Sequence, residues 1–264
     1  MPLVPAKCTN CGGILEVDNT KDAAICPYCG SAFIVEKAIN YYNVSYNINH
    51  VDTVNIYGGN SADFDIRAGT LLRYNGASMD VKIPDNVVSI DYKAFEGCDN
   101  LRSISFPGSI STIPWIFRSF KNLTCVTISN GVKSIDGGAF SGCTALTAVA
   151  IPGSVTSIGA DAFSGCSNLI SITIPSGLRS IENSAFQGCS ALTSVTIPNG
   201  VKSIGNSAFQ GCSALTSVTI PGSVTRIGSY AFNGCDSLVF IRVPERCFYD
   251  KYSTFPPFCA VERI

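Results

Sequence analysis

Four cysteines near the start of the chain have the spacing of a metal site. Cys8 and Cys11 form one C-x-x-C pair, and Cys26 and Cys29 form a second. A glycine follows each pair and permits the tight turn that a two-thiolate knuckle needs. Together the pairs supply four sulfur ligands, the set that holds Zn²⁺ in a closed tetrahedral structural site. We therefore expect a structural zinc ion, with an iron centre, two local disulfides or a redox C-x-x-C as alternatives.

The segment that carries these cysteines, residues 1–36, is too small to fold on its apolar residues alone. Its core candidates are Ile14, Leu15, Val17, Ile25, Phe33 and Ile34. It resembles a zinc ribbon, a module that metal binding stabilises. In this segment two lysines stand against four acidic residues, whereas phosphate binding needs clustered cations. We do not expect nucleic acid as a ligand, and a nucleic-acid-associated factor acting through the ribbon stays as an alternative.

A repeat of 23 residues organises the rest of the chain. Seven phenylalanines mark its units and an eighth marks a partial unit: Phe95, Phe117, Phe140, Phe163, Phe186, Phe209, Phe232 and Phe255. Every step is 23 residues except the first, which is 22, so the missing residue lies near Pro114-Trp115-Ile116. Such a period indicates a leucine-rich-repeat solenoid, in which each coil buries its apolar side against its neighbours.

The coil from Leu192 to Leu215 illustrates the expected strand. Side chains alternate across a strand, so Val195 and Ile197 should point inward while Ser194 and Thr196 point outward. The proline that follows lacks an amide proton and ends this strand. Stacked coils then form a core of like residue over like residue, with phenylalanine at its centre.

Later in the same coil, Ser207-Ala208-Phe209-Gln210 predicts one short helical turn, with Gly211 as its left-handed exit. Six coils have a cysteine at the next position: Cys98, Cys143, Cys166, Cys189, Cys212 and Cys235. One interpretation is a redox or metal ladder. We prefer the other, a small apolar side chain that packs beside the phenylalanine. Phe120 and Phe258 take the same position in two further coils, which suits packing.

The pattern I-P-x-x-V-x-S-I-G-x-x-A-F-x-G-C resembles the BspA-like class of leucine-rich repeats, found mostly in bacterial and some protozoan proteins. The resemblance covers residues from about 64 to 264. It implies a β-rich, right-handed, curved solenoid with short helical turns, which contacts other proteins. Many members are secreted or surface-attached adhesins, and this chain departs from them in lacking an export signal.

We expect three parts: a zinc ribbon over 1–36, an asparagine- and tyrosine-rich linker or strand over 37–60, and a solenoid over 61–264. Within the solenoid, 61–83 should form the first cap, 84–242 the repeats and 243–264 the second cap. Asn75-Gly76 in the first cap predicts a hairpin turn. The alternating residues of 37–60 suit a strand that pairs with a second copy in a homodimer, or a loosely docked linker, which we favour.

Composition excludes several classes of function. The chain has one histidine, His50, and no phosphate-binding loop, so we expect neither an enzyme nor a small-molecule substrate. Lys and Arg total 18 against 19 Asp and Glu, so no global field favours nucleic acid or a membrane. No apolar run is long enough to insert into a bilayer. Without a secretory signal we expect a cytoplasmic location, with a surface adhesin exported by a non-standard route as the alternative.

The partner remains an unknown protein, and outward strand positions are the candidates to contact it. They are Ser171, Thr173, Ser194, Thr196, Ser217, Thr219, Phe240 and Arg242. Phe240 beside Arg242 is the strongest pair, since aromatic residues and arginine are enriched in interfaces. For the hydroxyls of the central strands a merely solvated surface is the interpretation we favour, because serine and threonine suit solvent-facing strand positions. On the other extended segment Lys133, Arg179 and Lys202 share one position, with Arg226 next to it, and a solvated row is the interpretation we favour there.

Overall fold

The structure, a computed structural model, describes residues 3–7, 14–18, 23–25, 32–34 and 63–264. The chain divides into two compact units, residues 1–61 and 62–264. In the first unit two strand pairs are antiparallel: β1 (Leu3–Lys7) with β2 (Ile14–Asp18), and β3 (Ala23–Ile25) with β4 (Ala32–Ile34). The linker 37–60, with the expected homodimer strand, lies outside the described residues.

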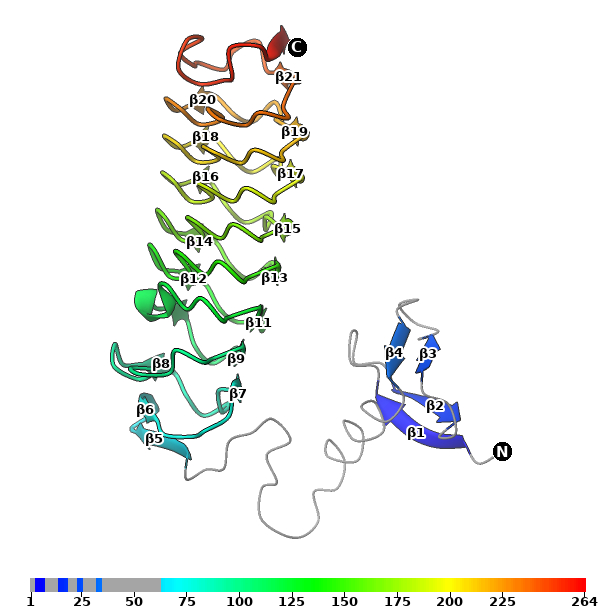
Figure 1. Cartoon of the computed structure of the whole chain (residues 1–264), viewed down its shortest axis with the longest axis vertical. Coiled ribbons are helices and arrows are strands. Elements are labelled where there is room, and N and C mark those ends of the chain that lie inside the picture. Colours follow the sequence, from blue (N-terminus) through cyan, green and yellow to red (C-terminus); the bar gives the residue numbers. More distant parts are fainter. Residues whose placement is uncertain (1–2, 8–13, 19–22, 26–31, 35–62) are drawn as a thin grey trace. The chain divides into compact units, whose positions relative to one another are not determined.

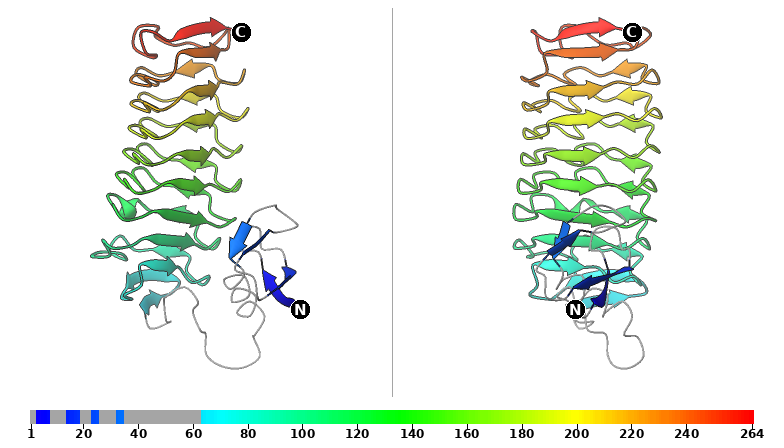
Figure 2. Two further views of the ribbon diagram at one scale, coloured as in Figure 1. Left: turned by 45° about the vertical axis from the view of Figure 1, so that its right-hand side comes forward. Right: turned by 90° about the vertical axis from the view of Figure 1, so that its right-hand side faces the viewer.

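The second unit is a solenoid whose coils each give one strand to a main sheet. These strands are β7 (Asp80–Lys82), β9 (Ser103–Phe106), β11 (Cys125–Ile128), β13 (Ala148–Ala150), β15 (Ser171–Thr173), β17 (Ser194–Thr196), β19 (Ser217–Thr219), β21 (Phe240–Val243) and β22 (Ala260–Arg263). They run parallel in two hydrogen-bonded groups, β15-β13-β11-β9-β7 and β17-β19-β21-β22. Figure 2 (right) shows these strands stacked in one direction.

Shorter strands line another side of the solenoid, which we call the second sheet, although they hydrogen-bond in separate groups, β10-β12-β14 and β16-β18-β20, with β8 beside the first hairpin (Figure 1). They are β8 (Ser89–Ile90), β10 (Thr112–Ile113), β12 (Ser134–Ile135), β14 (Ser157–Ile158), β16 (Ser180–Ile181), β18 (Ser203–Ile204) and β20 (Arg226–Ile227). Their serines partner serines of the next coil, as in Ser134↔Ser157 and Ser180↔Ser203. The leucine-rich-repeat solenoid predicted from the 23-residue period is confirmed.

The first end of the solenoid is covered by a hairpin of β5 (Phe64–Arg67) and β6 (Thr70–Tyr74), whose turn is Ala68-Gly69. Both turn residues have positive φ, 47° and 77°, as a two-residue hairpin turn requires. The hairpin predicted at Asn75-Gly76 is therefore wrong. Gly76 is needed for a different reason, because a Cβ there would lie 2.5 Å from the Tyr74 hydroxyl oxygen.

Stacked phenylalanines form the centre of the core, as predicted. From Phe117 to Phe255 each ring lies parallel to the next, with centroids 5.3 to 5.9 Å apart and interplanar angles of 7° to 19°. In the described residues the coil one residue short contains the 3₁₀ helix η2 (Trp115–Phe117). The missing residue thus changes the local turn while Phe117 stays in the stack.

The turn before each phenylalanine differs from the helical turn that we predicted. Ser207 has a φ of 55°, and its counterparts Asp161, Ser184 and Tyr230 also lie in the left-handed region. The amide of Gln210 donates to the Ser207 carbonyl oxygen at 3.1 Å, which closes a tight turn and no helix. A prediction from the helix propensity of one coil could not find this tight turn, because its amides bond to the next coil, as Ser207 N does to Ser229 O. The left-handed exit at Gly211, with a φ of 72°, is confirmed.

The repeated cysteines behave as packing residues. Five are fully buried, and each Sγ donates to a phenylalanine carbonyl oxygen of the preceding coil at 3.1 to 3.2 Å: Cys143, Cys166, Cys189, Cys212 and Cys235. Burial raises the pKa of Cys143 to about 12, so this thiol stays protonated and is a poor metal ligand.

Over the described ranges, no helix has the length and apolar character to cross a bilayer.

Candidate interaction surface

The four predicted zinc ligands lie outside the described residues, but the strands that flank them are described. Cys8 and Cys11 are in the connection between the antiparallel strands β1 and β2. Cys26 and Cys29 are in the connection between β3 and β4, which also pair antiparallel. In the sequence each cysteine pair therefore lies between two strands that pair with each other, and the zinc site itself stays a prediction.

The eight residues predicted to contact a partner are all exposed on the outer face of the main sheet. The strand register places Ser194 opposite Ser217 and Thr196 opposite Thr219, and Thr219 opposite Arg242. Inward neighbours such as Val195 are buried, so the expected alternation is confirmed. We call the outward positions of β11, β13, β15, β17 and β19 the neutral face, because they carry only hydroxyl, alanine and one cysteine side chain.

At the C-terminal end of the neutral face, Arg242 is already engaged within the chain. Its Nε lies 2.7 Å from a carboxylate oxygen of Glu262, and its guanidinium carbon lies 5.6 Å from the centre of the Phe240 ring. Phe240 keeps 45% of its surface exposed and Val239 keeps 63%. The apolar pair is thus available for contact, whereas the charge of Arg242 is balanced. Glu262 was missed at the sequence level because the last coil is 20 residues long, with Arg242 opposite Glu262.

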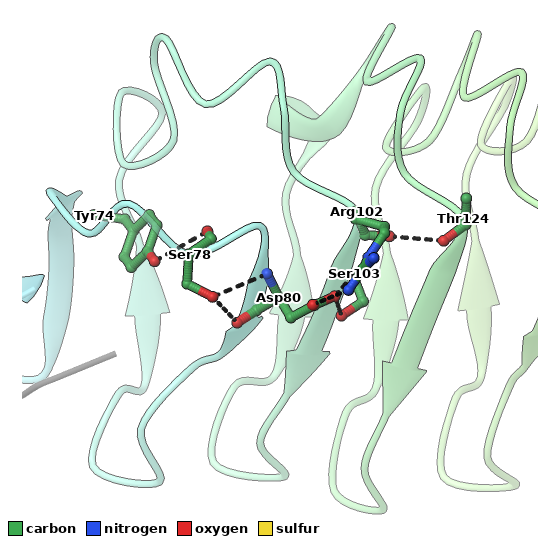
Figure 3. Close-up of polar contacts among 6 residues, drawn as sticks. All are labelled: Tyr74, Ser78, Asp80, Arg102, Ser103 and Thr124. Carbon is green, nitrogen blue, oxygen red and sulfur yellow. Dashed lines mark hydrogen bonds and ion pairs between the residues drawn. The ribbon is translucent and has the colours of Figure 1, made fainter. Parts of the chain in front are cut away.

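A second ion pair, between Arg102 and Asp80, lies beyond the N-terminal end of the neutral face (Figure 3). The Arg102 guanidinium binds both carboxylate oxygens of Asp80, and Ser103 Oγ donates to Asp80 Oδ1 at 2.6 Å. Hydrogen bonds from Arg102, then from Ser103, lower the pKa of the Asp80 carboxyl below its ordinary value. Sequence reasoning missed this pair, although the two residues sit one coil apart at neighbouring strand positions.

The basic row on the second sheet is exposed, as expected. Lys202 N donates to Arg179 O at 2.8 Å, so these two cations occupy adjacent coils at one position. Neither residue, nor Lys133 or Arg226, takes part in an ion pair with any described residue. No contact among the described residues distinguishes a partner site there from a solvated row, so this surface stays the weaker candidate.

A cleft of about 290 Å³ lies beside the irregular coil, with Phe95, Ile116 and Phe120 in its lining. Tyr92, Lys93 and Glu96 also line it. The cleft holds no histidine or cysteine, and His50 lies outside the described residues. Its polar groups, Lys93, Glu96 and Asp99, are solvated side chains without a shared hydrogen bond in the described part of the chain.

Comparison with known proteins gives one family match. The model of the BspA type Leucine rich repeat region, present in six copies, matches residues 74–191 and 137–259. No curated protein matches the sequence. These matched ranges span most of the solenoid, from β6 to the residues before β22.

Among solved structures, a Leucine Rich Repeat protein from T. pallidum is 28% identical, with a TM-score of 0.61 over 71% of this chain and 91% of that one. A leucine-rich repeat protein from Bacteroides ovatus is 23% identical, with a TM-score of 0.52 over 83% of this chain and 67% of that one. A leucine rich cell surface protein from Faecalibacterium prausnitzii is 28% identical over 68% of this chain and 64% of that one, but its TM-score is 0.40.

Proposed function

Because the chain belongs to the BspA type leucine-rich repeat family, we propose that it is a non-enzymatic module that binds another protein through the neutral face. The observation that carries this proposal is the contrast along the main sheet. Five successive strands present no charged side chain, and ion pairs stand at both ends. When a partner covers this face and displaces its water, no unpaired charge loses its hydration. Desolvating an unpaired charge is the costly step in association.

The rigidity of the neutral face supports the same function. Its strands rest on fully buried residues such as Leu192 and Phe209. A preorganised surface loses little conformational entropy on binding. Phe240 and Val239, exposed at its C-terminal margin, supply the large apolar side chains that commonly dominate interface energies.

Charge insertion tests the neutral face against the second sheet. Ser194→Glu places a carboxylate on the neutral face, and the matched control Thr156→Glu places one at the exposed position directly before β14. Cross-linking in the native cell, with mass-spectrometric identification of neighbours, should capture the same partner with wild type and Thr156→Glu and lose it with Ser194→Glu. A partner retained equally by both variants would refute the proposed face.

We also propose that Cys8, Cys11, Cys26 and Cys29 hold one structural zinc ion in the N-terminal unit. The donor set fits the metal: four thiolates satisfy tetrahedral zinc, and each pair connects two antiparallel strands. The ion would staple a unit too small to be stable by its apolar core alone. This site would have a structural role, since it leaves no coordination position for a substrate.

Metal analysis in reducing buffer tests the zinc site. The full chain should carry one zinc per molecule. Cys8→Ser with Cys11→Ser should lose it, whereas the control Cys212→Ala should keep it, because Cys212 is buried in the solenoid and donates to Phe186 O. Less than half a zinc per wild-type chain would overturn the assignment.

A cytoplasmic location stays our proposal. The nine cysteines between residues 63 and 264 are all free thiols, and a reducing compartment keeps both them and zinc-ligating thiolates intact. Cell fractionation decides the matter. Recovery of the protein from the cell surface or the medium would replace this location with that of an adhesin.

A further inference from the structure

In the regular coils, the turn that carries each phenylalanine donates backbone hydrogen bonds to the next coil. Phe140 N donates to Ala162 O at 2.8 Å, and Gly142 N donates to Ser164 O at 2.7 Å. The first of these donations recurs in other coils, from the amides of Tyr74, Phe163, Phe186, Phe209 and Phe232. Two carbonyl oxygens that lie two residues apart in an adjacent coil are therefore the usual acceptors for this turn.

This ladder of hydrogen bonds is interrupted between the coil of Phe95 and the irregular coil of Phe117. Phe95 and Gly97 hold the positions of the two donors, but no residue in the described part of the chain accepts a hydrogen bond from either amide. The irregular coil is one residue short, and its Trp115–Phe117 segment forms the helix η2. Its carbonyl oxygens therefore do not reach these amides, which leaves two donors without an acceptor.

The cleft of about 290 Å³ lies at this interruption. Phe95 and Gly97 line it from one coil, and Ile116 and Phe120 line it from the next. Gly97 has a φ of 81°, close to the 74° of Gly142, so the turn has the same backbone form and its amide keeps the direction toward the next coil. The cleft therefore has two backbone donors on one side and an apolar wall on the other.

Exposed aromatic side chains stand at the rim of the cleft. Tyr92 lines it and keeps 63% of its surface exposed, and Lys93 Nζ lies 5.4 Å from the centre of the Tyr92 ring. Trp115, which directly precedes Ile116, is 57% exposed. Tyrosine and tryptophan are among the residues that most often dominate the energy of an interface. This rim is therefore suited to contact with another polypeptide.

The charges around the cleft are of both signs, which disfavours an ionic ligand. Glu96 and Asp99 line the cleft, and neither forms an ion pair with a residue between 63 and 264. Arg118 and Lys121 hold the same two positions in the next coil and are exposed. Since the carboxylates and the cations offset one another, no strong field attracts an anion or a cation. A neutral acceptor is the ligand chemistry that fits the two free amides.

We propose that this cleft binds a short uncharged peptide segment of a partner protein. Two carbonyl oxygens of the segment, two residues apart, accept from Phe95 N and Gly97 N, and the apolar side chain between them packs against Ile116 and Phe120. Backbone hydrogen bonds give such a segment affinity, and the pocket for its side chain gives specificity. The site lies at the phenylalanine turns and not on the main sheet, so it does not rest on the function proposed for the neutral face.

Amide NMR of the full chain tests the cleft with a defined probe. The probe is the tripeptide Ac-Ala-Phe-Ser-NH2, which copies the acceptor segment 162–164. The amide proton signals of Phe95 and Gly97 should shift to lower field and saturate as the probe is added. Those of Phe140 and Gly142, already bonded to the next coil, should stay in place. No saturable shift at Phe95 and Gly97, or an equal shift at Phe140 and Gly142, would overturn the proposal.

Substitutions separate this site from the neutral face. Ile116→Asp places a charge in the apolar wall and should abolish the saturable shifts. Tyr92→Ala, at an exposed side chain that leaves the fold intact, should weaken binding of the probe by at least about fivefold. The control Ser194→Glu should bind the probe as wild type does, so the two proposals fail or stand separately. Unchanged binding in both cleft variants would refute the site, and so would acetate that produces the same shifts as the tripeptide.

Discussion

The two ends of the solenoid are finished differently. At the N-terminal end the hairpin β5–β6 covers the core, and the rings of Phe64, Tyr74 and Phe95 meet at tilted angles of 31° and 44°. At the C-terminal end the ring stack continues although the last coil is shorter, with Phe232 and Phe255 stacked at 9°. The first coil departs from the repeat where the hairpin covers it, whereas the last described coil keeps the ring stacking of the repeat.

The difference shows that closing a solenoid requires residues outside the repeat. The Ser78 hydroxyl at the first end has no counterpart in the regular coils, whereas Tyr74 takes the place of the repeated phenylalanine, as its bond from N to Ala94 O shows. At the last end only Arg263 has this role, since it lies over the Tyr249 ring, 4.4 Å from its centre, and binds three carbonyl oxygens. The segment 243–264 contains these contacts, and its role as the second cap stays a prediction.

The largest expected effect comes from opening the closed end. Leu71 is fully buried under the hairpin, and Leu71→Ala should lower the free energy of unfolding by about 2–5 kcal/mol through lost burial and a cavity. Val261→Ala in the last described coil should cost less than about 1.5 kcal/mol, because Val261 is only partly buried. Urea unfolding of both variants measures the contrast. Equal losses would show that the two ends are equally covered.

Removing the Arg263 clamp should have the next largest effect. Arg263→Gln should cost about 1.5–3 kcal/mol, the range for hydrogen bonds to a charged group. Arg242→Gln breaks an exposed ion pair and should cost about 0–1 kcal/mol. The same urea experiment compares the two. If Arg242→Gln proves the more costly, the closing role of Arg263 is wrong.

The closed end should loosen in acid. The pKa of Asp80 in the fold lies below its ordinary value of 3.8, so its bonds to Arg102 and Ser103 stabilise the fold above that value. This contribution is lost as the pH falls through the lowered pKa of the folded state. It should amount to about 0.2–1 kcal/mol, since the pair is largely solvated. Thermal unfolding between pH 5 and pH 2 measures this pH dependence. Asp80→Asn should remove this part of it, and an unchanged profile in the variant would contradict the role of Asp80.

The smallest effects concern left-handed turn residues at each end. Ala68 has a φ of 47° in the β5–β6 turn, and Ala68→Asn should stabilise the hairpin by up to about 1 kcal/mol, since asparagine tolerates this conformation. Tyr230, with a φ of 60°, holds the coil position that Gly138 holds earlier, and Tyr230→Gly should be neutral or stabilising by a similar amount. Thermal unfolding measures both, with Gly138→Ala as a control that should destabilise.

Sequence reasoning succeeded where the repeat itself imposes the answer. The inward positions of Val195 and Ile197, the stacked phenylalanines and the outward Ser194 follow from period and alternation, and the structure confirms them. It failed at Asn75-Gly76, where the local sequence favours a hairpin turn, because the Tyr74 side chain packs closely against Gly76 instead. It also failed at Ser207, whose conformation is set by a hydrogen bond to the next coil, at Ser229.

By itself the sequence determined the coil length, the buried rows and the face that points outward, because each depends on a pattern that every coil repeats. Only the tertiary structure decided which end is closed and which charges remain free. Those outcomes depend on single contacts between different coils, such as Arg102 with Asp80 and Arg242 with Glu262. Residues that occur once carry no period, so their partners become known only when the coils are stacked.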